Sequence, residues 1–137
     1  MNNLKRFLDA QQRDYATALA EIKAGSKRSH WMWYIFPQID GLGYSDMAKR
    51  YAIKDLAEAT DYLAHPVLGQ RLKDISAALL DLKSNNATQV MGSPDDLKLR
   101  SSMTLFALVE GNDSVFDKVL KKYFDGHKDT ATLQLVR

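Results

Sequence analysis

The side chains best suited to bind a ligand are concentrated between residues 23 and 38. Both tryptophans, Trp31 and Trp33, lie in this segment. No acidic residue occurs from 22 to 39, although the chain holds 17 acids against 19 lysines and arginines. Large aromatic rings beside uncompensated cations can hold a planar, anionic ligand, or they can pack a core. The basic side chains just ahead of or among the tryptophans are Lys23, Lys27, Arg28 and His30.

Lys27 and Arg28 are the residues that would hold a negative group. A guanidinium binds a phosphate or carboxylate through two hydrogen bonds, and an ammonium acts as a point charge. If Ser29 opens a helix, its free backbone N–H groups would add to the anion site. The competing interpretation is a solvated basic loop after the end of a helix, where cations are favourable in any case.

Trp31 or Trp33 would stack on the planar part of the ligand. On a helix, Trp31 and Tyr34 share one face and Trp33 points elsewhere, so one tryptophan can line a cleft while the other packs. Aromatic residues this dense more often belong to the core altogether. His30 is the candidate catalytic residue, because imidazole is the side chain best suited to carry protons near neutral pH.

Two further polar clusters would complete the site. Arg50 follows Asp46 and Lys49 at helical spacing, which favours a surface of ion pairs but also allows Arg50 to face the acid-free segment. Arg100 and Ser101 belong to a polar run that is unfavourable inside an apolar helix. Close helix packing explains that run as well as a ligand wall does. In the ligand hypothesis, Arg50, Arg100 and Ser101 form the wall opposite the tryptophans.

Several chemistries lack the residues they need. There is no cysteine, which excludes disulfides, thiolate metal sites and cysteine nucleophiles. The three histidines, His30, His65 and His127, show no paired spacing, so no metal site is expected, and no cofactor is predicted. No glycine-rich phosphate loop or dinucleotide motif is present. A net charge of only +2 disfavours a nucleic acid as partner.

The composition is that of one soluble domain. A chain of 137 residues with 45% hydrophobic content can bury a core, which predicts a single helical domain over residues 1–137. The first residues carry no signal-peptide pattern, and no segment reaches the length of a membrane span. We therefore expect a cytoplasmic protein without a membrane partner, whose oligomeric state the sequence leaves open.

Helical spacing of apolar residues predicts an all-α bundle of about seven or eight helices. The first covers residues 4–22, with a break at 11–14 as an alternative, and ends at Gly25. The apolar run 30–36 suits a buried strand or a buried helical turn, ended by Pro37. A short turn around Gln89 would end at Gly92. Further helix starts are predicted at Ser45, Asp55, Pro66, Ser93, Asp113 and Asp129, and the helix that Ser45 opens is predicted to run through Ile53.

Four long stretches of this sequence resemble one known family. They are GSKRSHWMWYIFPQIDGLGYSDMAKRYAI, YLAHPVLGQRL, DDLKLRSSMTLFA and VFDKVLKKYFDGHKDTATL. From about Leu4 to Leu135 the chain resembles the bacterial family catalogued as domain of unknown function 1810. The resemblance implies a compact multihelical cytoplasmic domain and no established activity, substrate or catalytic residue. Some members carry a calpastatin-like inhibitor label, which this apolar, patterned chain does not support, because such inhibitors are disordered and polar.

The leading hypothesis is a domain that binds a small anionic ligand with a planar part, such as a nucleotide or nucleotide derivative. Whether it also processes that ligand, with His30 as proton carrier, is left open. The alternative is a structural or protein-interaction domain without catalysis, in which the aromatic run is core and the cations are solvated. The two differ in burial: a ligand site needs a tryptophan and Arg28 beside one concave pocket.

Overall fold

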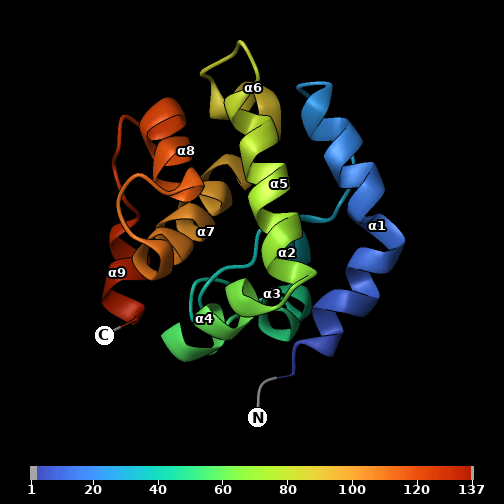
Figure 1. The fold of residues 1–137 in the computed structure, drawn as a ribbon, viewed down its shortest axis with the longest axis vertical. Helices are drawn as coiled ribbons and strands as arrows, with labels where there is room; N and C mark the ends of the chain where they lie inside the picture. Colours follow the sequence, from blue (N-terminus) through green and yellow to red (C-terminus); the bar gives the residue numbers. More distant parts are fainter. Residues whose placement is uncertain (1–2, 137) are drawn as a thin grey trace.

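Nine α-helices form the part of the chain that the structure, a computed structural model, describes, namely residues 3–136 (Figure 1). They are α1 (Lys5–Lys23), α2 (Met32–Ile35), α3 (Asp46–Arg50), α4 (Leu56–Ala64), α5 (Leu68–Leu80), α6 (Ala87–Met91), α7 (Asp95–Glu110), α8 (Val115–Phe124) and α9 (Thr130–Leu135). Within residues 3–136 there is no strand, only an isolated parallel bridge between Ile39 and Ile53. The predicted all-α class is confirmed, with nine helices in this region rather than seven or eight.

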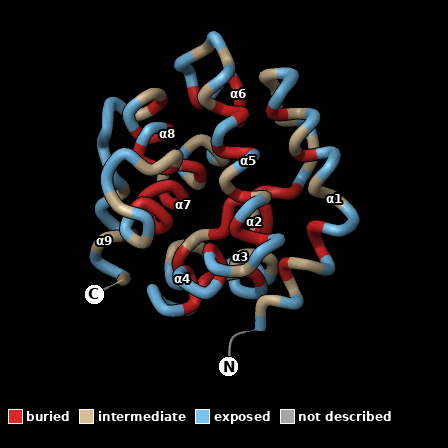
Figure 2. The backbone as a smooth tube through the Cα atoms, in the orientation of Figure 1, coloured by how far each residue is buried: buried red, intermediate tan, exposed pale blue. Residues whose placement is uncertain are grey.

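Helix α7 lies at the centre of a single hydrophobic core. It packs against α4, α6, α8 and α9, while α5 packs against α1, α4 and α8. Phe106 of α7 contacts aromatic rings of both α4 and α8. The centroid of its ring lies 5.4 Å from that of Tyr62 and 5.8 Å from that of Phe116. Figure 2 shows the middle of α7 and the short α2 as the most continuously buried segments. None of the described helices is both long and apolar enough to cross a membrane.

The apolar run 30–36 forms the buried helical turn α2, one of its two predicted conformations. Helix α1 is continuous through 11–14, so the alternative of a break there is wrong. The reason is tertiary: the amide of Gln11 is buried and donates to the carbonyl of Tyr34 and the hydroxyl of Tyr62, both at 2.8 Å. A polar residue inside a helix is tolerated when the fold supplies its partners.

Local capping explains most helix starts. The side chains of Ser45, Asp55 and Asp129 each accept a hydrogen bond from a backbone N–H in the first turn of α3, α4 and α9, as predicted. Helix α1 ends at Lys23, and Gly25 follows its C-cap residue with a φ of 79°, which a glycine adopts without strain. Helix α6 likewise ends at Gly92.

Three predicted helix starts and one predicted helix end are wrong. Helix α7 begins at Asp95 without a side-chain cap, because the N–H of Asp96 already bonds to the carbonyl of Gly92 at 2.8 Å; Ser93 is exposed. Helix α8 is capped by Ser114 rather than opened by Asp113. Helix α5 starts after Pro66, at Leu68, where the ring of His65 accepts the N–H groups. Helix α3 ends at residue 50 rather than 53, since residue 53 pairs with residues 38–40 instead.

Candidate functional site

The two tryptophans have different environments. Trp31 is 1% exposed and packs against Phe36, with 6.1 Å between ring centroids. Trp33, two residues further on, is only partly buried and lines a hollow on the surface. Trp31 is the N-cap residue of α2 and Trp33 lies within the helix, so the two side chains face different directions. Trp33 is therefore the tryptophan that a ligand can reach.

The hollow beside Trp33, which we name the main hollow, has a volume of about 220 Å³. It lies between the segment 33–52 and the first half of α7, with Asp129 contributed from the start of α9. Lys98 overlies Trp33, with 5.4 Å between its Nζ and the ring centroid. The lining residues are Trp33, Gln38, Ile39, Gly41, Leu42, Gly43, Ala48, Tyr51, Ala52, Pro94, Leu97, Lys98, Ser101 and Asp129.

Polar groups are placed at the edge of the main hollow. The hydroxyl of Ser101 donates to Oδ2 of Asp129 at 2.9 Å, and this oxygen also caps α9. Within residues 3–136, nothing hydrogen-bonds the side-chain amide of Gln38 or the hydroxyl of Tyr51. A ligand with donors and acceptors on its rim would find partners there.

A second hollow of about 250 Å³, which we name the polar hollow, adjoins the first. The two share the side chains of Trp33, Pro94 and Lys98. His30 lines the polar hollow, and its ring is exposed. The remaining lining residues are Lys27, Met32, Ser93 and Asp95.

Lys27 is nearly buried in the wall of the polar hollow. Its side chain is 6% exposed and pairs with Asp95 at 2.8 Å. Its Nζ also donates to the carbonyl of Ser29 and lies 4.7 Å from the ring centroid of Trp31. Lys27 therefore ties the loop after α1 to the first residue of α7, and it adds positive charge to the hollow.

The backbone N–H groups of residues 28 and 29 are already bonded to a carboxylate of the protein. Oε1 of Glu21 accepts from the N–H of Arg28 at 2.7 Å and of Ser29 at 3.0 Å. The hydroxyl of Ser29 donates to the other oxygen at 2.6 Å. Ser29 opens no helix, since α2 begins at Met32. These N–H groups are therefore not available to a ligand.

The hydrogen bonds also change the acidity of Glu21. Partial burial raises the pKa of its carboxyl, but the bonds from Ser29, Arg28 and Trp31 lower it more, and the net value is about 2. The acid-free segment, residues 22–39, is therefore hydrogen-bonded by the carboxylate of Glu21, which directly precedes it in the sequence.

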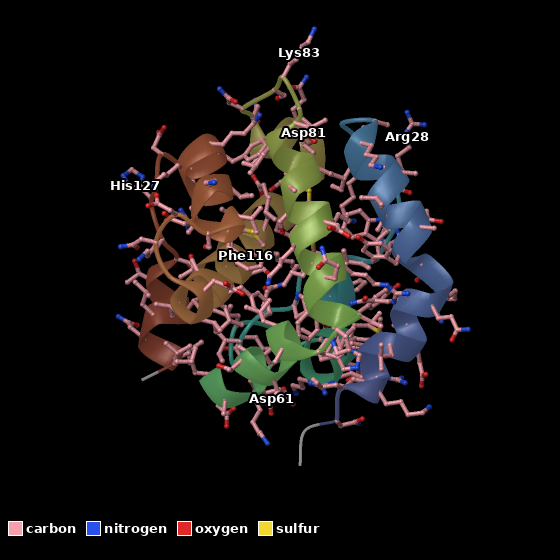
Figure 3. The ribbon with its side chains drawn as sticks, in the orientation of Figure 1. Arg28, Asp61, Asp81, Lys83, Phe116 and His127 are labelled. Carbon is pink, nitrogen blue, oxygen red and sulfur yellow. The ribbon has the colours of Figure 1, made fainter. Side chains whose placement is uncertain are left out.

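The structure does not bring the predicted arginines together. Arg28 is exposed on the loop after α1, where Figure 3 shows it pointing outward. The carbonyl of Arg50 accepts from Nε of Arg6 at 2.9 Å, which places Arg50 beside the start of α1. Helix α1 has 19 residues and is roughly 28 Å long, so Arg28 and Arg50 stand at opposite ends of it.

Arg100 lies on another side of α7. One of its guanidinium nitrogens is 3.9 Å from Oδ1 of Asp129, and its Nε is buried without a hydrogen bond among the described residues. It lines neither the main hollow nor the polar hollow. Of the predicted site residues, the structure gathers Trp33 and Ser101 at one hollow, and Lys27, His30 and Trp33 at the other.

Sequence reasoning missed several lining residues. The sequence could have indicated Lys98, because it lies three positions before Ser101 and hence on the same side of a helix. Asp129 was identified only as a cap. Gln38 and Tyr51 were not predicted, because the two segments that carry them are brought together only by the parallel bridge between Ile39 and Ile53.

Arg6 holds this wall of the main hollow in place. It donates to the carbonyl of Ala52 at 2.7 Å and pairs with the buried Glu58 at 3.2 Å. Glu58 in turn accepts the N–H of Lys54 at 2.9 Å. A buried charge is stable when it is paired and hydrogen-bonded in this way.

The fold and the paired hollows define a compact all-helical protein with one partly exposed tryptophan in a concave site. The chain belongs to the family described as protein of unknown function (DUF1810), whose model matches residues 1–136. The family resemblance that the sequence indicates is thereby confirmed.

A crystal structure with the same fold comes from a bacterium. The conserved hypothetical protein Rv1873 from Mycobacterium tuberculosis is 44% identical, with a TM-score of 0.94 over 97% of this chain and 95% of that chain. Among curated proteins, none matches this chain. The family is described as being of unknown function and the Mycobacterium protein as hypothetical, so a function has to be inferred from the site.

Proposed function

We propose that this protein binds a small anionic molecule with a planar ring, such as a nucleotide or nucleotide derivative, at the main hollow. The observation that carries this proposal is the position of Lys98, whose Nζ lies 5.4 Å from the centroid of the partly exposed Trp33 ring. A planar ring that stacks on Trp33 would take the place of the Lys98 ammonium over the indole, and the displaced ammonium would then pair with the ligand's charge.

The rest of the lining supports an oriented ligand. Apolar side chains such as Ile39 and Leu42 form part of the wall, and Gln38 and Tyr51 offer polar groups that no described residue bonds. Small-molecule sites commonly combine an apolar wall with a few polar groups that fix orientation. His30 lines the neighbouring hollow, so as a proton carrier it would act on a part of the ligand held there. The predicted cytoplasmic location and the absence of a nucleic-acid partner belong to the same proposal.

Tryptophan fluorescence tests the proposal directly, because the chain has two tryptophans. In Trp31→Phe, emission comes from Trp33 alone, and in Trp33→Phe it comes from the buried Trp31. A thermal-shift screen against nucleotides and phosphorylated metabolites first selects the compounds that raise the melting temperature. We expect such a compound to change the emission of Trp31→Phe at least several-fold more than that of Trp33→Phe.

A matched pair of lysine variants provides the control. Lys98→Gln should weaken binding about tenfold or more, which corresponds to losing one charge-assisted contact. Lys73→Gln removes a partly exposed lysine that pairs with Glu110 on α7, away from both hollows, and should leave affinity unchanged. Compounds that shift the melting temperature without affecting Trp33 emission would refute the main hollow as the site.

A second candidate is a protein-interaction domain, favoured by the apolar side chains at the mouth of the main hollow. Leu97 lines it and is 52% exposed, and Tyr44, which follows the lining residue Gly43, is 82% exposed. Exposed apolar groups around a hollow also suit a protein partner. In that case the screen should find no small molecule that perturbs Trp33, and Leu97→Gln should abolish an association that Lys98→Gln retains.

A further inference from the structure

We propose that the two hollows are subsites of one ligand, the main hollow taking its ring and the polar hollow taking its phosphate or other anionic group. This inference rests on the proposed function and narrows it to a ligand class. In such a ligand the stacking ring is uncharged and the negative charge lies on a substituent, as in a nucleoside monophosphate.

The two hollows share part of their lining. Trp33, Pro94 and Lys98 belong to both linings, so a ligand that stacks on Trp33 reaches the polar hollow within the length of one substituent. Lys98 marks the junction, since its Nζ lies 5.4 Å from the ring centroid of Trp33 and 3.6 Å from Oδ1 of Asp95.

The charges of the two linings differ. The polar hollow presents the ammonium groups of Lys27 and Lys98 against the single carboxylate of Asp95, and the imidazole of His30 adds a hydrogen-bonding group. The main hollow shares Lys98 but has Asp129 on its far side, next to Ser101. Arg100, 3.9 Å from Asp129, offsets part of that carboxylate's charge from behind the wall, but only the polar hollow has more lysines than acids in its lining, so an anionic group is attracted there.

Asp95 already pairs with the two ammonium groups that would bind a ligand anion. Its Oδ2 lies 2.8 Å from Nζ of Lys27 and its Oδ1 lies 3.6 Å from Nζ of Lys98. The carboxylate keeps both ammonium groups at the polar hollow, and it also opposes an incoming anion. Removing its charge without changing its shape should strengthen the binding of a phosphorylated ligand and leave the uncharged parent compound unaffected.

The experiment compares adenosine with adenosine 5′-monophosphate by isothermal titration calorimetry on the full chain. We expect the monophosphate to bind at least tenfold more tightly than the nucleoside. In Asp95→Asn this ratio should rise several-fold, and in Lys27→Gln it should fall towards one. Lys73→Gln is the control and should keep the wild-type ratio. Guanosine and uridine with their monophosphates extend the comparison to other rings.

The variants distinguish this inference from the proposed function. If a nucleoside and its monophosphate bind equally in the wild type, the polar hollow is not an anion subsite, while ring binding at Trp33 stands. If none of the six compounds binds, the proposed function itself fails for nucleotides. Lys27 is nearly buried, so circular dichroism must first show that Lys27→Gln is folded. Asp95→Asn tests the inference independently, and an unchanged ratio in it would contradict the role of this carboxylate.

Discussion

The carboxylate of Glu21 accepts a hydrogen bond from Nε1 of Trp31 at 3.0 Å, across the loop that joins α1 to α2. The same carboxylate bonds the N–H groups of Arg28 and Ser29. Because these donors converge on one side chain, Glu21 fixes the path of the loop. It thereby sets where α2 begins and where Trp33 stands, although Glu21 lines neither the main hollow nor the polar hollow.

Replacing Glu21 should therefore destabilise the protein. Glu21→Ala leaves several partly buried donors without their acceptor, and we expect the free energy of unfolding to fall by about 2 kcal/mol. Urea denaturation measures this. Glu110→Ala serves as the control, because the ion pair of Glu110 with Lys73 is partly exposed to solvent and should contribute less than about 1 kcal/mol. Equal effects of the two changes would contradict the role assigned to Glu21.

The acidity of Glu21 predicts a pH dependence. Its pKa is about 2 in the folded protein against an ordinary value of 4.5, so the unfolded chain binds the proton more readily between these values. The stabilisation is present above pH 4.5 and is lost as the pH falls towards 2. Melting temperatures should therefore decline less steeply over this range in Glu21→Gln than in the wild type. Parallel curves would show that the carboxylate is not the titrating group.

The two tryptophans should differ in their contribution to stability. Trp31→Ala empties a buried site and should cost roughly 3–5 kcal/mol. Trp33→Ala removes a partly exposed ring and should cost less than about 2 kcal/mol, because less apolar area leaves the interior. Urea unfolding of both variants measures the difference. Two equally large losses would favour the interpretation in which the whole aromatic run is core.

A pair of serines tests which of them caps a helix. Ser114 accepts the N–H of Asp117 in the first turn of α8, so Ser114→Ala should cost about 1 kcal/mol. Ser93 is exposed and does not cap α7, so Ser93→Ala should stay within about 0.5 kcal/mol of the wild type. Thermal unfolding of the two variants side by side is sufficient. A larger loss for Ser93 would mean that α7 begins earlier than Asp95.

The fold was largely predictable because the signals that define it are local. Ser45, Asp55 and Asp129 cap helices through bonds to residues three positions away, and apolar spacing reports which side of a helix is buried. The prediction that Ser93 caps α7 is wrong because the carbonyl of Gly92 already accepts a backbone N–H in the first turn of α7.

The site was less predictable because its pairings are distant in sequence. The segment around Trp33 is free of acids only in sequence: in space, Asp95 pairs with Lys27, and Glu21 bonds the backbone beside it. Likewise, the separation of Arg28 from Arg50 follows from the length and direction of α1, which composition does not encode.

The walls of the main hollow come from parts of the chain that are distant in sequence. Trp33 and Gln38 belong to its first third, whereas Lys98 and Asp129 belong to its last. A molecule bound between them is released by any opening that separates these parts, even if each helix stays intact. Such a ligand should therefore slow the amide hydrogen exchange of the most protected core positions, and not only that of the loops it touches. Binding would be coupled to the cooperative unfolding of the whole chain, and no isolated fragment of this sequence would retain it.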